Sequence, residues 1–448
     1  MKVLKFGGIS LRDAVAIKKV AQIISSDSEK KFVVVSAFYG VTDLLSELVS
    51  SLKNNLPQKA LECIDKVENI SQNIVSELNS VNSSGFVNDK LSELRQLVPA
   101  LSLLGETSPR SIDKILSYGE KISSFVLADY LNSVGIKTSF ADSERIIKTD
   151  SSYNCAVVDI EKTRAKIKDI VSPLFSENDC VVCAGFTGSD SKNSVTTLGR
   201  GGSDYTASVV AVCLNAERLE IWKEVDGIMT TDPRIIKTAK RIESLSYVEA
   251  SELAYFGAKV LHPKTIRPAI MAEIPVYIKK TSEPDFKGTV IRKDSDTQNE
   301  VKAVAFQKNV TVINICSEKM LGAYGFLSKV FDVFTRYRTP VDLITTSEIN
   351  ISVTVEKNAD IDNITRELST FSDVEISQDV AIISLVGEGL KFTSGIAARC
   401  FLAIGDINVL MVNMGASEVN LSIIVEQKDM ENAVFNLHYE FFEKGVEK

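Results

Sequence analysis

The chain of 448 residues is long enough for two or three domains that each have a core of their own. Its hydrophobic content of 44% and charged content of 25% are ordinary for a globular protein. Its 51 basic and 59 acidic residues give a formal charge of −8, which argues against a nucleic acid as partner. No apolar run reaches the roughly 18 residues of a membrane-spanning helix, and the N-terminus lacks a signal-peptide pattern. We therefore expect a cytoplasmic protein without a membrane partner.

Apolar strand patterns alternate with helical patterns through the first 278 residues. Strands are predicted at 2–6, 31–37, 137–141, 180–184, 219–222 and 275–278. Helices are predicted at 11–25, 42–54, 111–134, 159–171, 204–215 and 247–255, with an added helical subdomain at about 56–110. The alternation predicts an α/β fold with a mostly parallel sheet and helices on both faces. Sites in such sheets lie at the carboxyl ends of the strands.

The segment 196–207, Thr-Thr-Leu-Gly-Arg-Gly-Gly-Ser-Asp-Tyr-Thr-Ala, is the most informative stretch of the sequence. Three glycines surround Arg200, and Ser203 and Asp204 stand where the N-cap and first turn of a helix are expected. Glycines let the backbone approach a ligand, and a helix N-terminus beside an arginine attracts an anion. A flexible linker is the alternative, but linkers rarely carry such a run directly before an amphipathic helix.

A second candidate anion site follows the first predicted strand, where Lys5 precedes Gly7 and Gly8 and a helical pattern begins at Leu11. This order offers backbone amides at a helix N-terminus to a phosphate group. The Walker A sequence and the protein-kinase signatures are absent from the chain. Taken alone, the pattern also fits a plain tight turn.

Further motifs accompany these two loops in a fixed order. They are Val35–Asp43, Tyr118–Glu120, Gly185–Gly188, Val225–Ile228 with Thr231–Arg234, and Phe256–Pro263. In order and spacing the whole set resembles the aspartate kinases of the amino-acid kinase family. The resemblance covers nearly the entire chain. It implies transfer of the γ-phosphate of ATP, accompanied by Mg²⁺, to the side-chain carboxylate of L-aspartate. The reaction gives 4-phospho-L-aspartate and, in this family, is the first step in the biosynthesis of lysine, threonine and methionine.

Positions within the matching motifs correspond to the site residues of the family. The resemblance implies that Lys5 neutralises charge on the transferred phosphoryl group and that Asp204 orients Lys5 or the hydrated Mg²⁺. The resemblance also implies that Arg200 binds the α-carboxylate of aspartate and that Glu120 binds its α-ammonium group. The aspartate pocket is expected to comprise Ser36, Thr42, Glu120, Phe186, Arg200 and Ser203. The nucleotide is expected to contact Gly7, Gly8, Lys223, Glu224, Asp232, Arg234 and Lys259.

Each single assignment has a structural alternative. Glu120 could also be an ordinary carboxylate on the surface of a helix. Asp204 could be a helix-capping residue, and Lys259 could be a surface charge. Three places depart from the family pattern: Ile9 removes a hydroxyl from the first phosphate turn, Lys223-Glu224 replaces a Thr-Asp pair, and Met229 replaces an aromatic residue. These departures are expected around adenine and ribose, so they bear on nucleotide affinity more than on phosphoryl transfer.

The last third of the chain contains an internal repeat, 310–356 and 380–426. Each copy predicts the ferredoxin-like order βαββαβ and resembles an ACT domain, a module that senses small molecules. A duplication without a ligand is the alternative. We expect a kinase domain at 1–295, a first ACT domain at 310–380, and a second ACT domain formed by 301–309 and 381–448.

The first ACT domain resembles the lysine-sensitive branch of the family. Lysine is therefore expected as a feedback inhibitor, and a homodimer or larger homo-oligomer is expected through the ACT domains. The effector residues implied by the resemblance are Met320, Gly325, Phe326, Leu327, Val341, Asp342, Ser347 and Glu348. Ala323 and Pro340 replace hydroxyl-bearing residues of the pattern, which leaves open whether lysine, threonine or neither is the effector.

Two other functions stay open at this point. A kinase for another amino acid, such as glutamate, would share the glycine-rich loops. A non-catalytic amino-acid sensor would explain the altered nucleotide loop. A metal centre is not expected, because the chain has two histidines and its seven cysteines are scattered. The one metal-like spacing, Cys180-Val-Val-Cys183, lies in an apolar run that predicts a buried strand.

Overall fold

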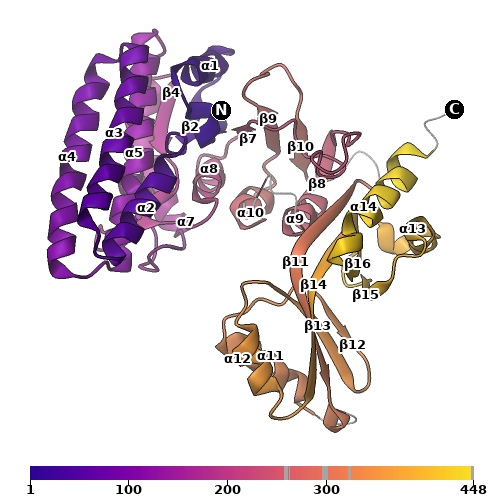
Figure 1. Cartoon of the computed structure of the whole chain (residues 1–448). Coiled ribbons are helices and arrows are strands. Elements are labelled where there is room, and N and C mark those ends of the chain that lie inside the picture. The colour runs from indigo at the N-terminus through magenta and orange to yellow at the C-terminus, as the bar shows by residue number, and fades with distance from the viewer. Residues whose placement is uncertain (257–260, 262, 295–300, 321–323, 445–448) are drawn as a thin grey trace. The chain divides into compact units, whose positions relative to one another are not determined.

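A computed structural model describes residues 1–256, 261, 263–294, 301–320 and 324–444 (Figure 1). The chain divides into two compact units. The first unit comprises Met1–Ile228 and Val260–Lys293, and the second comprises Met229–Lys259 and Asp294–Lys448. Each unit is described by itself.

The first unit contains a sheet whose strands have the order β3-β4-β2-β1-β7-β9-β10. These strands are β1 (Lys2–Phe6), β2 (Lys31–Val35), β3 (Thr138–Ala141), β4 (Cys180–Ala184), β7 (Arg218–Lys223), β9 (Val276–Lys280) and β10 (Thr289–Arg292). Neighbouring strands pair in parallel except that β10 runs antiparallel to β9. The predicted mostly parallel sheet is confirmed, and the central strands β1, β2 and β4 are buried along their whole length, as expected where helices cover both faces of a sheet.

Helices surround this sheet and supply the rest of the core. The helical elements of the first unit are η1 (Gly8–Leu11), α1 (Ala14–Ser25), α2 (Val41–Lys53), α3 (Pro57–Leu78), α4 (Val81–Leu104), α5 (Pro109–Ser133), α6 (Ser143–Ile146), α7 (Ile160–Lys166), η2 (Ile167–Val171), η3 (Ser172–Ser176), α8 (Gly202–Cys213) and α10 (Pro263–Met271). In Figure 1, α3, α4 and α5 are long helices packed side by side. Helices α3 and α4 confirm the helical prediction for the stretch 56–110.

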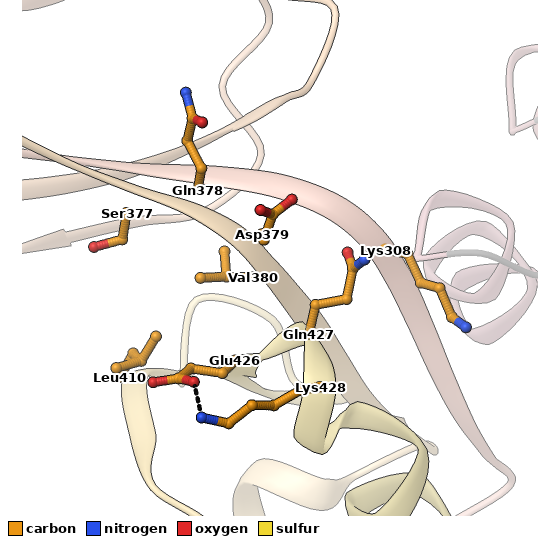
Figure 2. A pocket seen from close by; sticks show the side chains of 9 residues that line it. All are labelled: Lys308, Ser377, Gln378, Asp379, Val380, Leu410, Glu426, Gln427 and Lys428. Carbon is orange, nitrogen blue, oxygen red and sulfur yellow. Dashed lines mark ion pairs between the residues drawn. The ribbon is translucent and has the colours of Figure 1, made fainter.

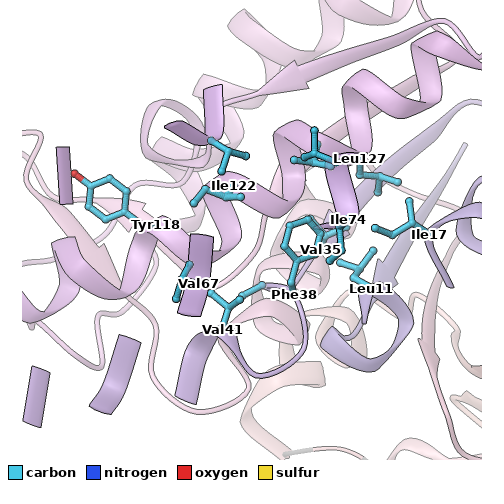
Figure 3. Close-up of a cluster of buried hydrophobic side chains, with 14 of the residues drawn as sticks. Leu11, Ile17, Val35, Phe38, Val41, Val67, Ile74, Tyr118, Ile122 and Leu127 are labelled. Atoms are coloured by element: carbon cyan, nitrogen blue, oxygen red, sulfur yellow. The ribbon is translucent and has the colours of Figure 1, made fainter. Parts of the chain in front are cut away.

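One large apolar cluster joins the sheet to the five helices α1 to α5 (Figure 3). It combines Val35 of β2 with Ile17 of α1, Val41 of α2, Val67 of α3 and Leu127 of α5. All five side chains are almost completely buried. The cluster therefore fixes α5 against the sheet, and α5 carries Glu120.

Two predicted helix starts are wrong in detail. The helix predicted from Leu11 is instead the 3₁₀ turn η1 followed by α1, whose N-cap is the side chain of Asp13. The N-cap of α8 is Gly201 rather than Ser203. Gly201 has φ of 75°, a left-handed conformation that glycine adopts without steric cost, so the glycine displaces the hydroxyl residue from the capping position.

Several short elements were not predicted from the sequence. A two-stranded hairpin, β5 (Thr187–Ser189) and β6 (Val195–Thr197), follows β4. Helices α6 and α10 and strand β10 are likewise additions to the predicted set. The hairpin matters most for function, because it leads directly into the segment that contains Arg200.

The second unit contains a six-stranded antiparallel sheet with the order β12-β13-β11-β14-β16-β15. Its strands are β11 (Ala303–Cys316), β12 (Ile344–Thr346), β13 (Asn350–Glu356), β14 (Asp373–Val386), β15 (Val409–Met414) and β16 (Asn420–Glu426), and a short strand β8 (Ser244–Ser246) precedes them in the chain. Its helical elements are α9 (Tyr247–Tyr255), η4 (Glu318–Met320), α11 (Phe326–Arg336), α12 (Ile361–Leu368), η5 (Leu390–Phe392), α13 (Ile396–Ile404), η6 (Gln427–Asp429), α14 (Met430–His438) and η7 (Tyr439–Glu443).

The two long strands β11 and β14 lie side by side at the centre of this sheet. Residues 303–307 of β11 pair with 382–386 of β14, whereas 310–316 pair with 373–380. Bulges separate the two registers near Val310. Apolar cores form separately on α11 and α12 and on α13 and α14. Each repeat therefore has a core of its own on a shared sheet.

Candidate active site

A cavity of about 420 Å³ opens in the first unit where β1, β2 and β4 end. Eight residues predicted for catalysis or aspartate binding line it: Lys5, Ser36, Thr42, Glu120, Phe186, Arg200, Ser203 and Asp204. Residues not predicted from the sequence also line it, among them Ser46, Leu116, Asn154 and Thr197. The predicted catalytic and aspartate-binding residues thus line one cavity at the carboxyl edge of a parallel sheet, where such folds bind ligands.

A charge cluster borders the cavity: the buried side chains of Lys5 and Asp204 line it, and the half-buried Lys223 lies beside them. Nζ of Lys5 lies 2.7 Å from Oδ1 of Asp204, and Nζ of Lys223 lies 2.9 Å from Oδ2. Burial alone would raise the pKa of Asp204, but the two ammonium groups outweigh it and hold the pKa at about 2. Burial also lowers the pKa of Lys5 below its usual 10.5, an effect that Asp204 opposes. The carboxylate is therefore ionised and engaged by two cations.

Glu120 lies on the side of the cavity formed by α5. The residue is 4% exposed, and among the described residues Oε2 of its carboxylate has no hydrogen-bond partner. Burial raises the pKa of Glu120 to about 7, against the opposing influence of the Ala37 amide and Lys5. A carboxylate with an unsatisfied oxygen beside a cavity is suited to a cationic group of a ligand.

Glycines bring the segment between β4 and β5 close to the start of α8. A Cβ atom on Gly185 would lie 2.6 Å from Cβ of Ser203, and one on Gly202 would lie 2.7 Å from the ring of Phe186. Phe186 itself has φ of 68°, and its amide donates to Oγ1 of Thr206 over 3.1 Å. The backbone is thus held in an unusual conformation that directs Phe186 and Ser203 to the same cavity.

Asp113 is a residue of this site that sequence reasoning missed. Its fully buried carboxylate accepts hydrogen bonds from the amide of Asn154 at 3.0 Å, and from the amide and hydroxyl of Thr197 at 2.8 and 2.5 Å. Both partners line the cavity. Asp113 precedes Glu120 by two helical turns on α5, and this shared helix face is the one signal that could have identified it.

Part of the predicted nucleotide set lies next to this cluster. The amide of Gly7 donates to the carbonyl of Trp222 over 3.3 Å, which places Gly7 beside the end of β7. A Cβ atom on Gly8 would lie 3.1 Å from the carbonyl oxygen of Ala37. Lys223 pairs with Asp204 as described, and Glu224 is exposed.

The remaining predicted nucleotide residues are Asp232, Arg234 and Lys259. Asp232 and Arg234 belong to the second unit, where Nε of Arg234 donates to Oδ1 of Asp232 over 3.0 Å. Lys259 falls outside the described residues, as does His262.

Comparison with known proteins decides the family. The family model "Amino acid kinase family" matches residues 1–280, and an ACT domain model matches 313–362 and 383–441. The lysine-sensitive aspartokinase 3 of Escherichia coli (strain K12) is 34% identical over 98% of this chain and 99% of its own length. Aspartokinase 1, chloroplastic, of Arabidopsis thaliana is 36% identical over 99% of this chain and 80% of its own length. This chain belongs to the aspartate kinases.

Solved structures agree with this assignment. E. coli aspartokinase III in complex with aspartate and ADP (R-state) has a TM-score of 0.87 at 34% identity, and covers 99% of this chain and 100% of the other. The same enzyme with lysine and aspartate (T-state) has a TM-score of 0.83 over the same shares. As an aspartate kinase, this chain uses ATP to phosphorylate the side-chain carboxylate of L-aspartate.

The predicted effector residues of this aspartate kinase all lie in the second unit. Met320, Phe326 and Val341 pack against the apolar core of α11 and α12, and Gly325 is the N-cap of α11. The other predicted residues, which are exposed or half-buried, are Leu327, Asp342, Ser347 and Glu348.

Asp342 is the most distinctive of them. Its Oδ1 accepts a hydrogen bond from the hydroxyl of Tyr255 over 2.7 Å. Its Oδ2 is buried and has no hydrogen-bond partner among the described residues. Burial raises the pKa of this carboxyl group, while the Tyr255 hydroxyl opposes the rise. The unsatisfied oxygen can accept a hydrogen bond from a ligand.

A larger hollow of about 610 Å³ also lies in the second unit (Figure 2). It is lined by residues of β11, β14, β15, β16 and η6, including Lys308, Asp379 and Leu410. Lys428 on its rim forms an ion pair with Glu426 over 2.5 Å. None of the eight predicted effector residues lines this hollow, so it is separate from the predicted effector set.

The described residues contain no group of three or more His, Cys, Asp or Glu side chains arranged to hold a metal ion. Cys180 and Cys183 lie in β4 as predicted, where burial raises the pKa of both thiols. In the part of the chain that the structure describes, no helix combines the length and apolar character needed to cross a membrane.

Proposed function

We propose that the cavity around Lys5 and Asp204 is the site at which this aspartate kinase binds L-aspartate and phosphorylates it. The observation that carries the proposal is the Lys5–Asp204–Lys223 charge cluster beside a cavity that Lys5, Asp204, Glu120 and Arg200 line. A carboxylate acceptor is already ionised at neutral pH and needs no general base. The main task of the site is therefore to bring two anions together.

Lys5 supplies the positive charge at the point of transfer, and Asp204 holds it there. Because both oxygens of Asp204 are engaged by lysine ammonium groups, we assign this residue to orienting Lys5 rather than to direct binding of Mg²⁺. Mg²⁺ would arrive with ATP and be held by its phosphates, where it neutralises charge. Gly7 donates its amide to Trp222, so Gly8 is the residue of that pair whose amide we assign to phosphate.

The amino-acid end of the substrate requires two opposite charges. Arg200 binds the α-carboxylate, for which its planar guanidinium group has two parallel donors. Glu120 binds the α-ammonium group through its unsatisfied oxygen. Phe186, Ser203, Ser36 and Thr42 complete the pocket.

Replacement of Arg200 tests this assignment. Arg200→Ala should raise KM for aspartate by about 10- to 100-fold, because a charge-assisted hydrogen bond contributes about 1.5–3 kcal/mol. KM for ATP should change by less than about twofold, since no contact to the nucleotide is assigned to Arg200. Arg12→Ala is the matched control, because Arg12 is exposed in the same unit and pairs with Asp13. An unchanged KM for aspartate in Arg200→Ala would contradict the assignment.

For the second unit we propose that lysine is the feedback inhibitor and that Asp342 binds its ammonium group. The proposal is supported by the buried, unsatisfied Oδ2 of Asp342 and by the lysine complex of the E. coli relative. Asp342→Asn should raise the lysine concentration for half-inhibition at least about tenfold while uninhibited turnover is kept. Threonine, tested in parallel, should not inhibit. Equal inhibition of both proteins by lysine would contradict this role.

The domain organisation belongs to the same proposal. A kinase domain at 1–295 precedes an ACT domain at 310–380, which is inserted into a second ACT domain formed by 301–309 and 381–448. The change of register between β11 and β14 near Val310 supports the insertion. We propose a cytoplasmic homodimer, or a larger homo-oligomer, assembled through the ACT domains.

A further inference from the structure

Arg200 lies in the short segment between β6 and α8, and its side chain has no support of its own. The residue is exposed, and among the described residues its guanidinium group forms no hydrogen bond or ion pair. The glycines on either side, Gly199 and Gly201, have φ of 73° and 75°. Glycine allows many other backbone conformations as well. The position of Arg200 at the cavity therefore depends on how the segment is held at its base.

Just before this arginine, the segment contacts a loop formed by residues 150–157. The amide of Ala156 in the loop donates to the carbonyl of Thr197 over 2.9 Å. A Cβ atom on Gly199 would lie 3.1 Å from the carbonyl oxygen of Asn154. The two backbones are thus in direct contact, so a shift of the loop relative to β6 would move the base of the arginine segment.

The carboxylate of Asp113 ties the loop 150–157 to β6. It accepts a hydrogen bond from the amide of Asn154 over 3.0 Å, and from the amide and hydroxyl of Thr197 over 2.8 and 2.5 Å. The carboxylate is the acceptor in every one of these contacts, which is the pattern of its ionised form. Asp113 is completely buried, and within the described part of the chain no lysine or arginine pairs with it. Neutral donors from the two segments therefore stabilise it.

The helix that carries Asp113 gives it a fixed position. Asp113 stands on α5, which the large apolar cluster fixes against the sheet. Glu120 stands two turns further along the same helix. The residue proposed to bind the α-ammonium group and the residue that ties the loop to β6 thus share one rigid element.

We infer that Asp113 is a positioning residue for aspartate binding: by tying the loop 150–157 to β6, it holds the backbone from which Arg200 binds the α-carboxylate. The inference rests on the proposed role of Arg200 as the contact for that group. A guanidinium group forms two parallel hydrogen bonds with a carboxylate only when its position and angle are right. Asp113 itself does not line the cavity, whereas Asn154 and Thr197 do, so Asp113 acts through these neighbours.

The test separates aspartate binding from nucleotide binding. Asp113→Asn keeps the size of the side chain but places an NH₂ group where a carboxylate oxygen accepts a hydrogen bond, so at least one link is lost. KM for aspartate should rise about tenfold, and KM for MgATP should stay within about twofold of the parent. In the Arg200→Ala background, Asp113→Asn should raise KM for aspartate by less than about twofold, because the group that it positions is absent.

Two further variants make the result specific. Thr197→Val removes the hydroxyl donor and keeps the amide donor, so KM for aspartate should rise about threefold, again with little effect in the Arg200→Ala background. Tyr153→Phe removes a hydrogen bond between the same loop and Asp190, and should leave both KM values unchanged. Thermal unfolding of each variant shows whether it is folded at the assay temperature. If Asp113→Asn is not folded, Thr197→Val provides the test.

The outcomes distinguish the inference from the proposal beneath it. If Arg200→Ala raises KM for aspartate but folded Asp113→Asn and Thr197→Val do not, the inference fails and the proposed role of Arg200 stands. If Asp113→Asn raises both KM values equally, or multiplies the effect of Arg200→Ala, Asp113 is merely structural and the inference also fails. If Arg200→Ala leaves KM for aspartate unchanged, the proposed role of Arg200 fails and the inference fails with it.

Discussion

The ammonium group of Lys5 is buried, and the carboxylate of Asp204 stabilises it there. Burial opposes both charges, yet the pKa of Asp204 is held at about 2 against an ordinary 3.8. At 1.36 kcal/mol per pKa unit, this is on the order of 2 kcal/mol of stability. Because the pKa is depressed, that stability is present above pH 3.8 and is lost as the pH falls through about 2. The cluster is therefore fully charged at neutral pH.

Removal of the Asp204 charge should disable transfer more than substrate binding. In Asp204→Asn, Lys5 and Lys223 repel each other without a counterion, so Lys5 loses its position and part of its charge. We expect kcat to fall by about 10²- to 10³-fold, the range for loss of one electrostatic group at a reacting centre. Asp169→Asn, an exposed isosteric change in the same unit, should keep full activity. Near-parental kcat in Asp204→Asn would contradict the role of the cluster.

Glu120 should give the enzyme a pH dependence near neutrality. Its pKa is raised to about 7 in the fold from an ordinary 4.5, so the folded chain binds this proton more tightly than the unfolded chain. The associated stability is complete below about pH 4.5 and is lost as the pH rises through about 7, a loss on the order of 3 kcal/mol. In the free enzyme, ionised Glu120 is also the form that attracts the aspartate ammonium group.

Glu120→Gln should remove both effects. Urea unfolding at pH 5.5 and 8.5, chosen about 1.5 units either side of the Glu120 pKa, should show the parent losing more stability than the variant. The rise of kcat/KM for aspartate with pH around 7 should disappear in the variant. Glu62→Gln, an exposed change on α3, should behave like the parent. Identical pH profiles for parent and Glu120→Gln would refute the assignment.

At the scale of elements, the site depends on how closely the segment between β4 and β5 approaches α8. Gly185→Ala would place Cβ 2.6 Å from Cβ of Ser203, which must then shift. We expect a loss of about 1–3 kcal/mol of stability and a higher KM for aspartate. Gly85→Ala is the matched control, since Gly85 lies inside α4 with open space around it. That change should stabilise the fold by about 0.5–1 kcal/mol. Unchanged kinetics in Gly185→Ala would show that the close approach is not required.

Elements with a strong local pattern could be predicted from the sequence. Strands such as β2 and β4 are continuous apolar runs, and α3 and α4 have sustained helical spacing. The β5–β6 hairpin was missed because its three-residue strands are mostly polar and owe their burial to tertiary packing. The start of α8 was misplaced because a glycine with positive φ caps it.

The same distinction applies to the site. Lys5, Arg200 and Asp204 could be predicted because each stands in a motif with a recognisable neighbourhood in the sequence. Asp113 could not, because its partners lie far away in the chain and only folding brings them together. Long-range hydrogen bonds of single buried side chains leave no local pattern to detect.

At the scale of the whole molecule, a hydrogen bond within the second unit should set the sensitivity of the enzyme to lysine. Tyr255 at the end of α9 donates to Asp342, the residue proposed to bind the effector. Tyr255→Phe frees that carboxylate, so we expect lysine to bind about three- to tenfold more tightly, as loss of one competing hydrogen bond implies. Calorimetric titration with lysine measures this, with Tyr439→Phe, a half-exposed tyrosine, as control. Weaker lysine binding in Tyr255→Phe would mean that Tyr255 contacts the effector instead.

The central claim is that this chain phosphorylates aspartate and that its second unit controls the reaction. The most direct measurement is the rate of ADP release by the purified protein with MgATP and L-aspartate, with L-glutamate or no acceptor as references, each with and without L-lysine. We predict turnover that requires aspartate and is suppressed by lysine. Turnover with glutamate alone, or lysine binding without any aspartate-dependent ADP release from the folded protein, would contradict the account.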